Sequence, residues 1–449
     1  MVQFYSPKKK KEQKPQDIQL TIEGLDAFGQ GIAKAKRKTY FISGALPGEV
    51  VIARITDDKR QFAKGDAFKL LKQSALRQAP TCRHYPLCGG CQQQHVKIEL
   101  QQQSKLDALL HLLSQGDSAE LERLSARASV LATTPYGYRR RVKLGLQYLP
   151  KQQQLVMGFR EKSSNTLVDI TMCPVRVESI ASLLVPLRQL LANLSIVRRL
   201  GHVEIVAADN TTVVLLRHLA PLSAQDSAVI TAFAEKNHVT FYLQGNNAEP
   251  ALLCGQPPYY CLDGLTFHFE PGGFIQVNGE VNQQMVAQAL AWLDLHATDH
   301  VLDLFCGIGN FTLPIAQRTA SVIGIEGVRQ SVEMATRNAQ SNQIDNVQVF
   351  HANLDGDVKA HSWSHQPVDK VLLDPARAGA LETMNWLIAL SPLSIVYVSC
   401  NPATLARDCQ ILREHGYLIE KVCMLDMFPN TQHLESMVLL TKKKDGKPR

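Results

Sequence analysis

Residues 300–317 read HVLDLFCGIGNFTLPIAQ, in which a hydrophobic strand runs into a glycine-containing loop and then into a helix. Glycine in such a loop lets backbone N–H groups and the start of the helix approach an adenosyl ligand closely. A second strand ends in Glu326, where a carboxylate of a β-α-β unit can accept the two hydroxyls of a ribose. The loop carries Asn310 and Phe311 in place of the third glycine of the dinucleotide fingerprint, which favours S-adenosylmethionine over a nicotinamide cofactor.

Two later strands also end in side chains that carry chemistry. PVDKVLLDPARAG (367–379) places Asp374 at a strand end, and SIVYVSCNPATLARD (394–408) places Cys400 at the next. Open α/β sheets bind their ligands at the carboxyl ends of parallel strands. From about residue 266 the alternation of strands and helices therefore predicts an α/β fold, a Rossmann-like S-adenosylmethionine-dependent methyltransferase domain. It also predicts that the Cys400 thiol lies at the opening of the ligand site.

Length and composition limit what the rest of the chain can be. The 449 residues exceed one ordinary domain, and 45% hydrophobic with 20% charged residues suffices for a packed core. The sequence shows no apolar run of about 18 residues, so we expect neither secretion nor membrane spanning, and we assign the protein to the cytoplasm. Ten cysteines in a reducing compartment favour metal binding or catalysis over disulfides.

Positive charge is concentrated at the N-terminus. Residues 1–80 hold 16 Lys and Arg against 8 Asp and Glu, whereas the remaining 369 residues are close to neutral. Short strands with glycine turns at 15–75 predict a small all-β barrel of the OB type, and its cations suit a phosphate backbone. A solvated tail is the alternative for the run of lysines in the arm at 1–14, which we expect to be disordered.

Three closely spaced cysteines predict a ligand site in the segment 76–265, which otherwise has a mixed α+β pattern. They lie in TCRHYPLCGGCQQQH (81–95), and Cys173, followed by proline, is the best fourth candidate, giving the set Cys82, Cys88, Cys91 and Cys173. Spacing alone favours zinc and an iron–sulfur cluster about equally. His84 and His95 are possible zinc ligands, although a surface position is the more ordinary expectation for them.

The middle of the chain holds a helix and a basic strand. Residues 100–114 show one leucine-rich face, and this helical segment, near 95–125, can pack on the last domain. Residues 136–149 read YGYRRRVKLGLQYL, with cations beside aromatic rings. These side chains either hold an RNA backbone and stack on a base or are solvated charges at a strand edge.

This set of side chains fits one kind of transfer. Carbon 5 of uracil becomes nucleophilic only after a thiolate adds at carbon 6, and a base must later remove the carbon 5 proton before the thiolate leaves. Cys400 can supply the thiolate, and Asp374 can hold the ring. Glu435, in TQHLESMVLL, is a candidate base, with a surface carboxylate as the alternative reading. A stacked base must be flipped out to reach such a crevice.

The motifs together resemble the RNA uracil-5 methyltransferase family, in particular its 23S ribosomal RNA branch with an N-terminal TRAM domain and a [4Fe-4S] cluster. The resemblance rests on the barrel, the four cysteines, FIQVN (274–278), DLFCGIGNF, LLDPARAG, SCNPATLARD and HLE (433–435), in the family's order. It implies that Cys400 is the nucleophile and Glu435 the base. It also implies a crevice for S-adenosylmethionine and the target base lined by Gln276, Phe305, Asn310, Glu326, Asn353 and Asp374.

The same resemblance implies that the four cysteines hold a [4Fe-4S] cluster with a structural or RNA-positioning role. It further implies a TRAM domain at 15–75, 23S ribosomal RNA as partner, no membrane and a monomer. Relatives acting on transfer RNA typically lack both the TRAM module and the four cysteines. Ala376 is a departure, because many relatives have proline there.

Several alternatives stay open at this point. The same chemistry could act on another ribosomal uridine or on transfer RNA. A protein of another class, a non-catalytic iron–sulfur RNA-binding protein, would have no use for Cys400. Methylation of an adenine amino group would need an aromatic residue where Arg377 stands.

Overall fold

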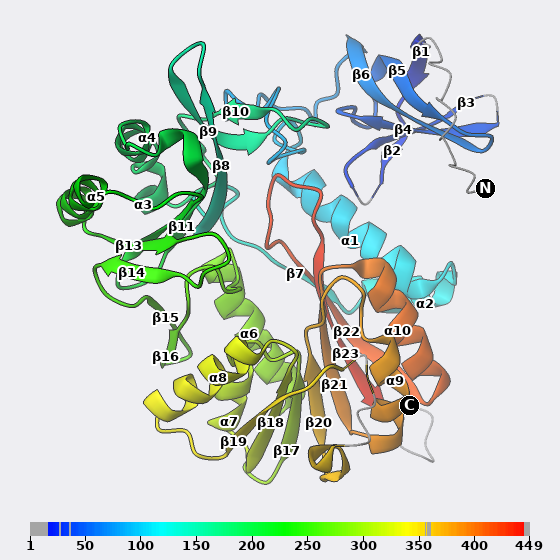
Figure 1. Ribbon diagram of the computed structural model, residues 1–449. Coiled ribbons are helices and arrows are strands. Elements are labelled where there is room, and N and C mark those ends of the chain that lie inside the picture. The colour runs from blue at the N-terminus through cyan, green and yellow to red at the C-terminus, as the bar shows by residue number, and fades with distance from the viewer. Residues whose placement is uncertain (1–16, 27, 36, 355, 357–360, 444–449) are drawn as a thin grey trace, which may run out of the picture.

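The computed structural model describes residues 17–26, 28–35, 37–354, 356 and 361–443, so the predicted arm at 1–14 lies outside the described residues. Three sheets of six, seven and eight strands and one hairpin follow each other along the chain. Figure 1 shows them as a strand-rich N-terminal unit, a mixed central unit and a C-terminal sheet covered by helices. Among the described helices, none combines the length and apolar character that crossing a bilayer demands.

The N-terminal sheet curls around a small apolar core that includes Ile22, Ile42 and Val51. Its strand order is β1-β5-β6-β4-β3-β2, and every neighbouring pair is antiparallel except β4 and β6. No Lys or Arg is among the buried residues in the described part of this unit. The strands are β1 (Asp17–Thr21), β2 (Gly24–Leu25), β3 (Gly31–Ala35), β4 (Lys38–Ser43), β5 (Val50–Asp58) and β6 (Phe62–Lys72).

The central sheet has the order β10-β9-β8-β11-β12-β13-β14 and packs helices against one apolar core. Its elements are β8 (Arg141–Leu149), β9 (Gln154–Arg160), β10 (Leu167–Asp169), α3 (Glu178–Ala181), α4 (Leu184–Ala192), η1 (Val197–Arg199), β11 (Leu200–Ala207), β12 (Thr212–His218), α5 (Ala224–Asn237), β13 (Val239–Gln244) and β14 (Ala251–Cys254). The hairpin β15 (Tyr259–Leu262) and β16 (Leu265–His268) leads on to the last sheet.

The C-terminal sheet has the order β19-β18-β17-β20-β21-β23-β22-β7. Its elements are α6 (Gly279–Leu293), β17 (His300–Leu304), α7 (Thr312–Ala316), β18 (Ser321–Glu326), α8 (Arg329–Ser341), β19 (Val347–His351), η3 (Ser362–His365), β20 (Lys370–Leu373), α9 (Leu381–Leu390), β21 (Ser394–Ser399), α10 (Pro402–Glu414), β22 (Tyr417–Leu425) and β23 (Glu435–Lys442). The five strands from β19 to β21 are parallel, and the antiparallel β23 pairs with β21. This arrangement confirms the predicted α/β, Rossmann-like fold.

A segment from far upstream completes this sheet. β7 (Ala128–Leu131) pairs in parallel with β22, and α1 (Ile98–Ser114) and α2 (Ser118–Ser125) cover the same side. Leu109 and Leu113 of α1 are buried in one core with residues of α10 and β22. Figure 1 shows α1 lying between the N-terminal barrel and the C-terminal sheet. The helix therefore forms one wall of the space between these two units.

Candidate active site

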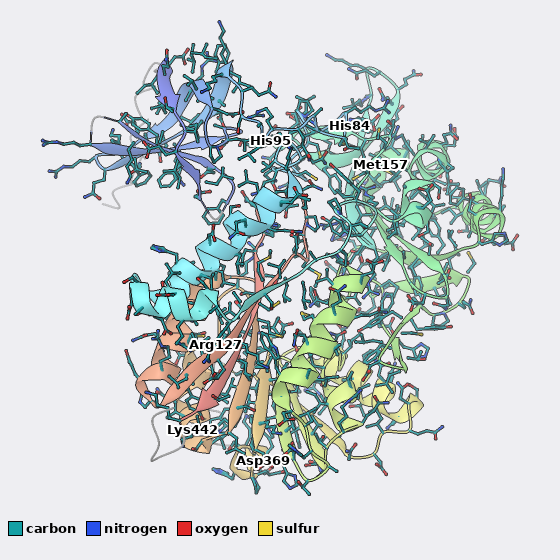
Figure 2. All side chains as sticks on the ribbon, turned by 180° about the vertical axis from the view of Figure 1, so that it is seen from behind. His84, His95, Arg127, Met157, Asp369 and Lys442 are labelled. Carbon is teal, nitrogen blue, oxygen red and sulfur yellow. The ribbon has the colours of Figure 1, made fainter. Side chains whose placement is uncertain are left out.

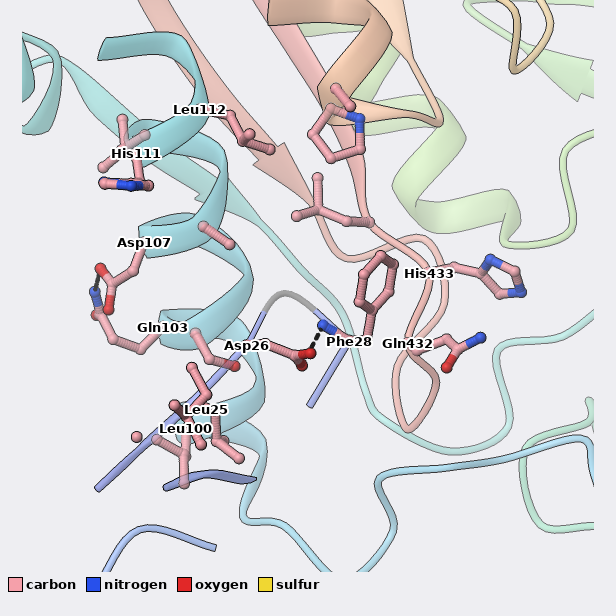
Figure 3. Close-up of a pocket in the computed structure, with 18 of the residues that line it drawn as sticks. Leu25, Asp26, Phe28, Leu100, Gln103, Asp107, His111, Leu112, Gln432 and His433 are labelled. Carbon is pink, nitrogen blue, oxygen red and sulfur yellow. Dashed lines mark hydrogen bonds between the residues drawn. The ribbon is translucent and has the colours of Figure 1, made fainter. Parts of the chain in front are cut away.

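A large cavity opens where the barrel, α1 and the last sheet meet. Its volume is about 1250 Å³, and Arg377, Cys400, Asn401 and His433 line its floor. Figure 3 shows α1 along one side, the loop that carries Gln432 and His433 along the other, and the barrel loop with Phe28 between them. The cavity exceeds the volume of an ordinary small-ligand pocket, about 300 to 1,000 Å³, and suits part of a macromolecule.

The barrel contributes an exposed aromatic ring to this cavity. Phe28 is 58% exposed and is one of the lining residues. The carboxylate of Asp26 accepts the backbone N–H groups of Phe28 at 2.9 Å and of Gln30 at 2.7 Å, which fixes the loop (Figure 3). Sequence analysis missed this residue, because nothing in a short barrel loop shows which distant element it faces.

Strand register brings Cys400 and Glu435 together. β21 and β23 are antiparallel, and their last pair is Ser399 opposite Ser436, whose hydroxyl donates to the Ser399 carbonyl at 3.2 Å. The next residue of β21 is Cys400, and the preceding residue on the other strand is Glu435, so both stand at the same edge of the sheet. Each is half-buried.

The turn after Cys400 is held by hydrogen bonds. Asn401 caps α10 by accepting the N–H of Ala403 at 3.2 Å, and its amide donates to the Arg377 carbonyl at 2.9 Å. Thr404 also donates to the Arg377 carbonyl, at 3.3 Å. These bonds fix the two loops that follow β20 and β21 relative to each other, and Asp374 and Cys400 lie in these loops.

Burial raises the pKa of each acidic group at this edge of the sheet. Burial, with a further contribution from Asp374, raises the pKa of Glu435 to about 8, against the opposing charges of Arg377 and Lys105. Burial alone raises the pKa of Asp374 to about 7. Burial and then the two carboxylates raise the pKa of the Cys400 thiol to about 11. Glu435 can therefore exchange a proton near neutral pH, as a general base must.

A buried ion pair lies within electrostatic reach of Glu435. Lys105 of α1 and Asp426 are almost fully buried, and their side chains are 2.9 Å apart. The ammonium also donates to the Phe428 carbonyl at 3.3 Å. The helix at the cavity wall is thereby tied to the segment that leads into β23. Sequence analysis missed this pair, because its members are more than 300 residues apart.

The glycine loop after β17 has the features of an adenosyl site. Glu326, at the end of β18, accepts the N–H groups of Gly307 at 3.1 Å and of Val328 at 2.8 Å. A side chain at Gly307 would meet open space, so the backbone faces an empty region there. Phe305 has a φ of 63°, a conformation that non-glycine residues adopt at functional turns more than elsewhere. The loop is therefore shaped for a ligand that approaches the backbone.

The other predicted cofactor residues are distributed around this loop. Asn310 accepts the Tyr260 hydroxyl and exchanges amide hydrogen bonds with Asn282, each at 3.0 Å. The N–H of Asp374 donates to the Leu304 carbonyl at 3.2 Å. Asn353 follows β19 at the same end of the sheet as Glu326. Gln276 lies before α6, with its carbonyl bonded to Arg140 at 2.8 Å.

Three side chains of the basic segment 136–149 make contacts within the protein. Arg140 is buried, stacks 4.7 Å from the Tyr260 ring centre and bonds to Gln276, so it is neither solvated nor accessible to RNA. Arg141 pairs with Glu204 at 3.0 Å. The side chain of Tyr138 is buried, and its hydroxyl donates to the Pro429 carbonyl at 3.0 Å. Neither of the readings left open in the sequence applies to Arg140 or Tyr138.

The four candidate cysteine ligands line one cavity. Its volume is about 240 Å³, and its wall includes all of Cys82, Cys88, Cys91 and Cys173. Neither His84 nor His95 lines it; both lie in the segment between the barrel and the central sheet (Figure 2), and His95 is hydrogen-bonded to Tyr85 at 2.6 Å. Among the described residues, no three His, Cys, Asp or Glu stand close enough for a single metal ion.

The cysteine loop is attached to the segment that carries Glu435. The N–H groups of Gln92 and Gln93 both donate to the Asn430 carbonyl at 3.0 Å. His433 lines both the cysteine cavity and the large cavity that contains Cys400. The shape of the loop before β23 therefore depends on the cysteine loop.

Known proteins match this chain along almost its entire length. The model of the tRNA (uracil-5-)-methyltransferase family matches residues 104–443, and that of the TRAM domain matches residues 12–68. Relatives named "23S rRNA (uracil(1939)-C(5))-methyltransferase RlmD" occur in Pectobacterium atrosepticum, 49% identical over 98% of each chain, and Yersinia enterocolitica, 48% identical over 99% of each.

Solved structures share the fold. The crystal structure of Pyrococcus abyssi tRNA (uracil-54, C5)-methyltransferase in complex with S-adenosyl-L-homocysteine superimposes with a TM-score of 0.73. It covers 94% of this chain and 100% of its own, at 24% identity, so it supports the fold alone. The family match and the full-length relatives show that the chain belongs to the tRNA (uracil-5-)-methyltransferase family.

Proposed function

We propose that the protein transfers a methyl group from S-adenosylmethionine to carbon 5 of one uridine in 23S ribosomal RNA. The enzyme class, an S-adenosylmethionine-dependent RNA uracil-C5 methyltransferase, follows from family membership. The observation that carries the proposal is that Cys400, which lines a cavity large enough for RNA, stands at the same sheet edge as Glu435. The ribosomal substrate is supported by relatives that carry that name over their full length.

In the proposed reaction, the Cys400 thiolate forms a bond to carbon 6 of the flipped uracil, and the ring electrons move to make carbon 5 nucleophilic. The sulfonium of S-adenosylmethionine supplies the methyl group. Carbon 5 then bonds to that carbon as the sulfonium–methyl bond breaks. Glu435 takes the carbon 5 proton, and the ring double bond re-forms as the carbon–sulfur bond breaks, which restores the thiolate.

The remaining groups at the edge have positioning roles in this proposal. The pKa of Cys400 is raised to about 11, so the thiol is protonated before RNA binds and must release its proton to solvent as the ring enters. Arg377 opposes that rise and would stabilise the thiolate. Asp374, with a pKa raised to about 7, can hydrogen-bond the uracil edge. Gln276, Phe305, Asn310, Glu326 and Asn353 would hold the donor around the glycine loop.

Each part of the chain has its own role in the proposed function. The barrel at 15–75 would bind RNA through its cations, the central part at 76–265 would present the cysteine site, and residues 266–449 would carry the chemistry. Phe28 and α1 would flank the RNA as it enters the large cavity. Aromatic rings in such positions stack on bases without regard to sequence.

Labelling of isolated RNA tests the proposed substrate. The protein, a methyl-labelled donor and unmodified 23S ribosomal RNA should give label in 5-methyluridine at a single uridine. The matched control is the same RNA with that uridine changed to cytidine, which should accept no label. Label in transfer RNA but not in ribosomal RNA would contradict the proposed substrate, and label in adenine would contradict the chemistry.

We further propose that the four cysteines hold a [4Fe-4S] cluster with a structural role. Support comes from the four thiols that line one cavity of about 240 Å³, since four cysteine thiolates are the usual ligands of such a cluster. Protein purified without oxygen should contain iron and sulfide in equal amounts. Cys173→Ser should lose most of both, whereas Cys261→Ser, at an exposed thiol, should retain them. Zinc without visible absorbance would contradict the cluster.

A further inference from the structure

Arg176 has no partner for its charge. The side chain is 3% exposed, and all three guanidinium nitrogens are buried without a hydrogen-bond partner. A buried, unpaired cation is among the most costly groups that a folded protein can contain. No ion pair joins it to a carboxylate within the described part of the chain, so the described residues leave its charge without a hydrogen-bonded counter-ion.

The arginine lines the cysteine cavity. Its guanidinium lies 4.9 Å from the centre of the Phe159 ring, and both residues belong to the cavity wall. Its backbone N–H donates to the Cys173 carbonyl at 3.2 Å, so the side chain is fixed three residues after one of the thiols. The unpaired guanidinium and the four thiols therefore share one cavity.

We propose that Arg176 is the counter-cation and N–H donor of the iron–sulfur cluster held by Cys82, Cys88, Cys91 and Cys173. This inference rests on the proposed cluster. Four thiolates around an iron–sulfur core leave a net negative charge, and a guanidinium presents several N–H groups to sulfur acceptors in a rigid fork. Such hydrogen bonds stabilise the more negative, reduced state and thereby raise the reduction potential. They also slow the loss of the cluster to a chelator.

Three variants separate hydrogen bonding to the cluster from an unspecific effect of positive charge and from an effect of side-chain packing. Arg176→Met removes the charge but keeps an apolar stem over Phe159, and Arg176→Lys keeps the charge but loses the fork. Lys162→Met is the matched control, because Lys162 is an exposed cation within electrostatic reach of Cys88 and Cys91. Each protein is purified without oxygen and measured for iron and sulfide content, reduction potential and rate of bleaching by a chelator.

We expect Arg176→Met to bleach about 10-fold faster than the unchanged protein, in line with the loss of other outer hydrogen bonds to metal sites. Its reduction potential should be lower. The bleaching rate and the reduction potential of Arg176→Lys should lie between those of Arg176→Met and the unchanged protein. Lys162→Met should bleach at a rate within about twofold of the unchanged protein, because water screens the charge of Lys162. If Arg176→Met does not fold, the potential and bleaching rate of Arg176→Lys decide.

The outcomes distinguish the two proposals. An unchanged protein without iron and sulfide would overturn the cluster and the role of Arg176 with it. A cluster whose potential and bleaching rate do not respond to the Arg176 variants would leave the cluster in place and overturn the role of the arginine. Equal effects of Lys162→Met and Arg176→Met would also overturn it, since they would reduce the role to unspecific charge.

Discussion

Replacing Cys400 by alanine is expected to reduce uridine methylation by on the order of 10⁴-fold or more, to the background rate. Without a thiolate at carbon 6, carbon 5 of uracil has no electron pair to offer the methyl group, and no neighbouring group can substitute for sulfur. RNA binding should be nearly unchanged, because the large cavity and the barrel remain intact. Rates are measured with a labelled donor, and affinity is measured separately by equilibrium binding of the same RNA.

Cys261→Ala provides the matched control for this variant. Cys261 is an exposed thiol on β15, outside the large cavity, and its loss should leave the rate as it was. Methylation by Cys400→Ala at close to the original rate would remove the assigned nucleophile. Equal losses in Cys400→Ala and Cys261→Ala would point to general damage by cysteine substitution.

Replacing Glu435 by glutamine should stop the reaction after methyl transfer. The amide cannot accept the carbon 5 proton, so the bond between Cys400 and carbon 6 cannot be eliminated. Release of methylated RNA should fall by about 10² to 10⁴-fold, the usual contribution of a general base. A covalent complex of protein and methylated RNA should accumulate, and denaturing electrophoresis with label in the methyl group detects it. Glu414→Gln, at an exposed position late in α10, is the control.

The pH dependence follows from the same residue. A base acts in its ionised form, and the raised pKa of Glu435, about 8, means that this form increases as the pH passes from 7 to 9. Turnover by the unchanged protein should therefore rise across this interval. In Glu435→Gln, the rate of covalent-complex formation should show no pH dependence with a pKa of about 8. Release of free methylated RNA by Glu435→Gln at the original rate, with no complex, would exclude Glu435 as the base.

Local patterns were sufficient to predict the parallel part of the fold. Four of its five strands, β17, β18, β20 and β21, are short, largely buried runs followed closely by glycine, Asp-Pro or Asn-Pro, and such signals act over a few residues. They placed Glu326, Asp374 and Cys400 at the carboxyl edge because parallel strands share that edge. The position of Glu435 depends instead on how the antiparallel β23 inserts between β21 and β22.

Contacts between distant segments could not be read from the sequence. The basic run at 139–143 looks the same whether its side chains face RNA or pack inward, and Arg140 is buried because Tyr260, 120 positions later, provides the ring beneath it. In the same way, no sequence motif marks Arg176, and only the structure shows that its guanidinium has no hydrogen-bond partner among the described residues. Packing between segments that are distant in the sequence decides whether such a side chain is buried or accessible.

The position of β7 has a consequence for biosynthesis. This edge strand ends at residue 131, and β22, with which it pairs, ends at residue 425. At ordinary elongation rates the nascent chain delivers the first strand roughly 15 to 60 s before the second. During that delay the apolar side of α1 has no sheet to cover, and a chaperone that shields it would be needed until the C-terminus leaves the exit tunnel.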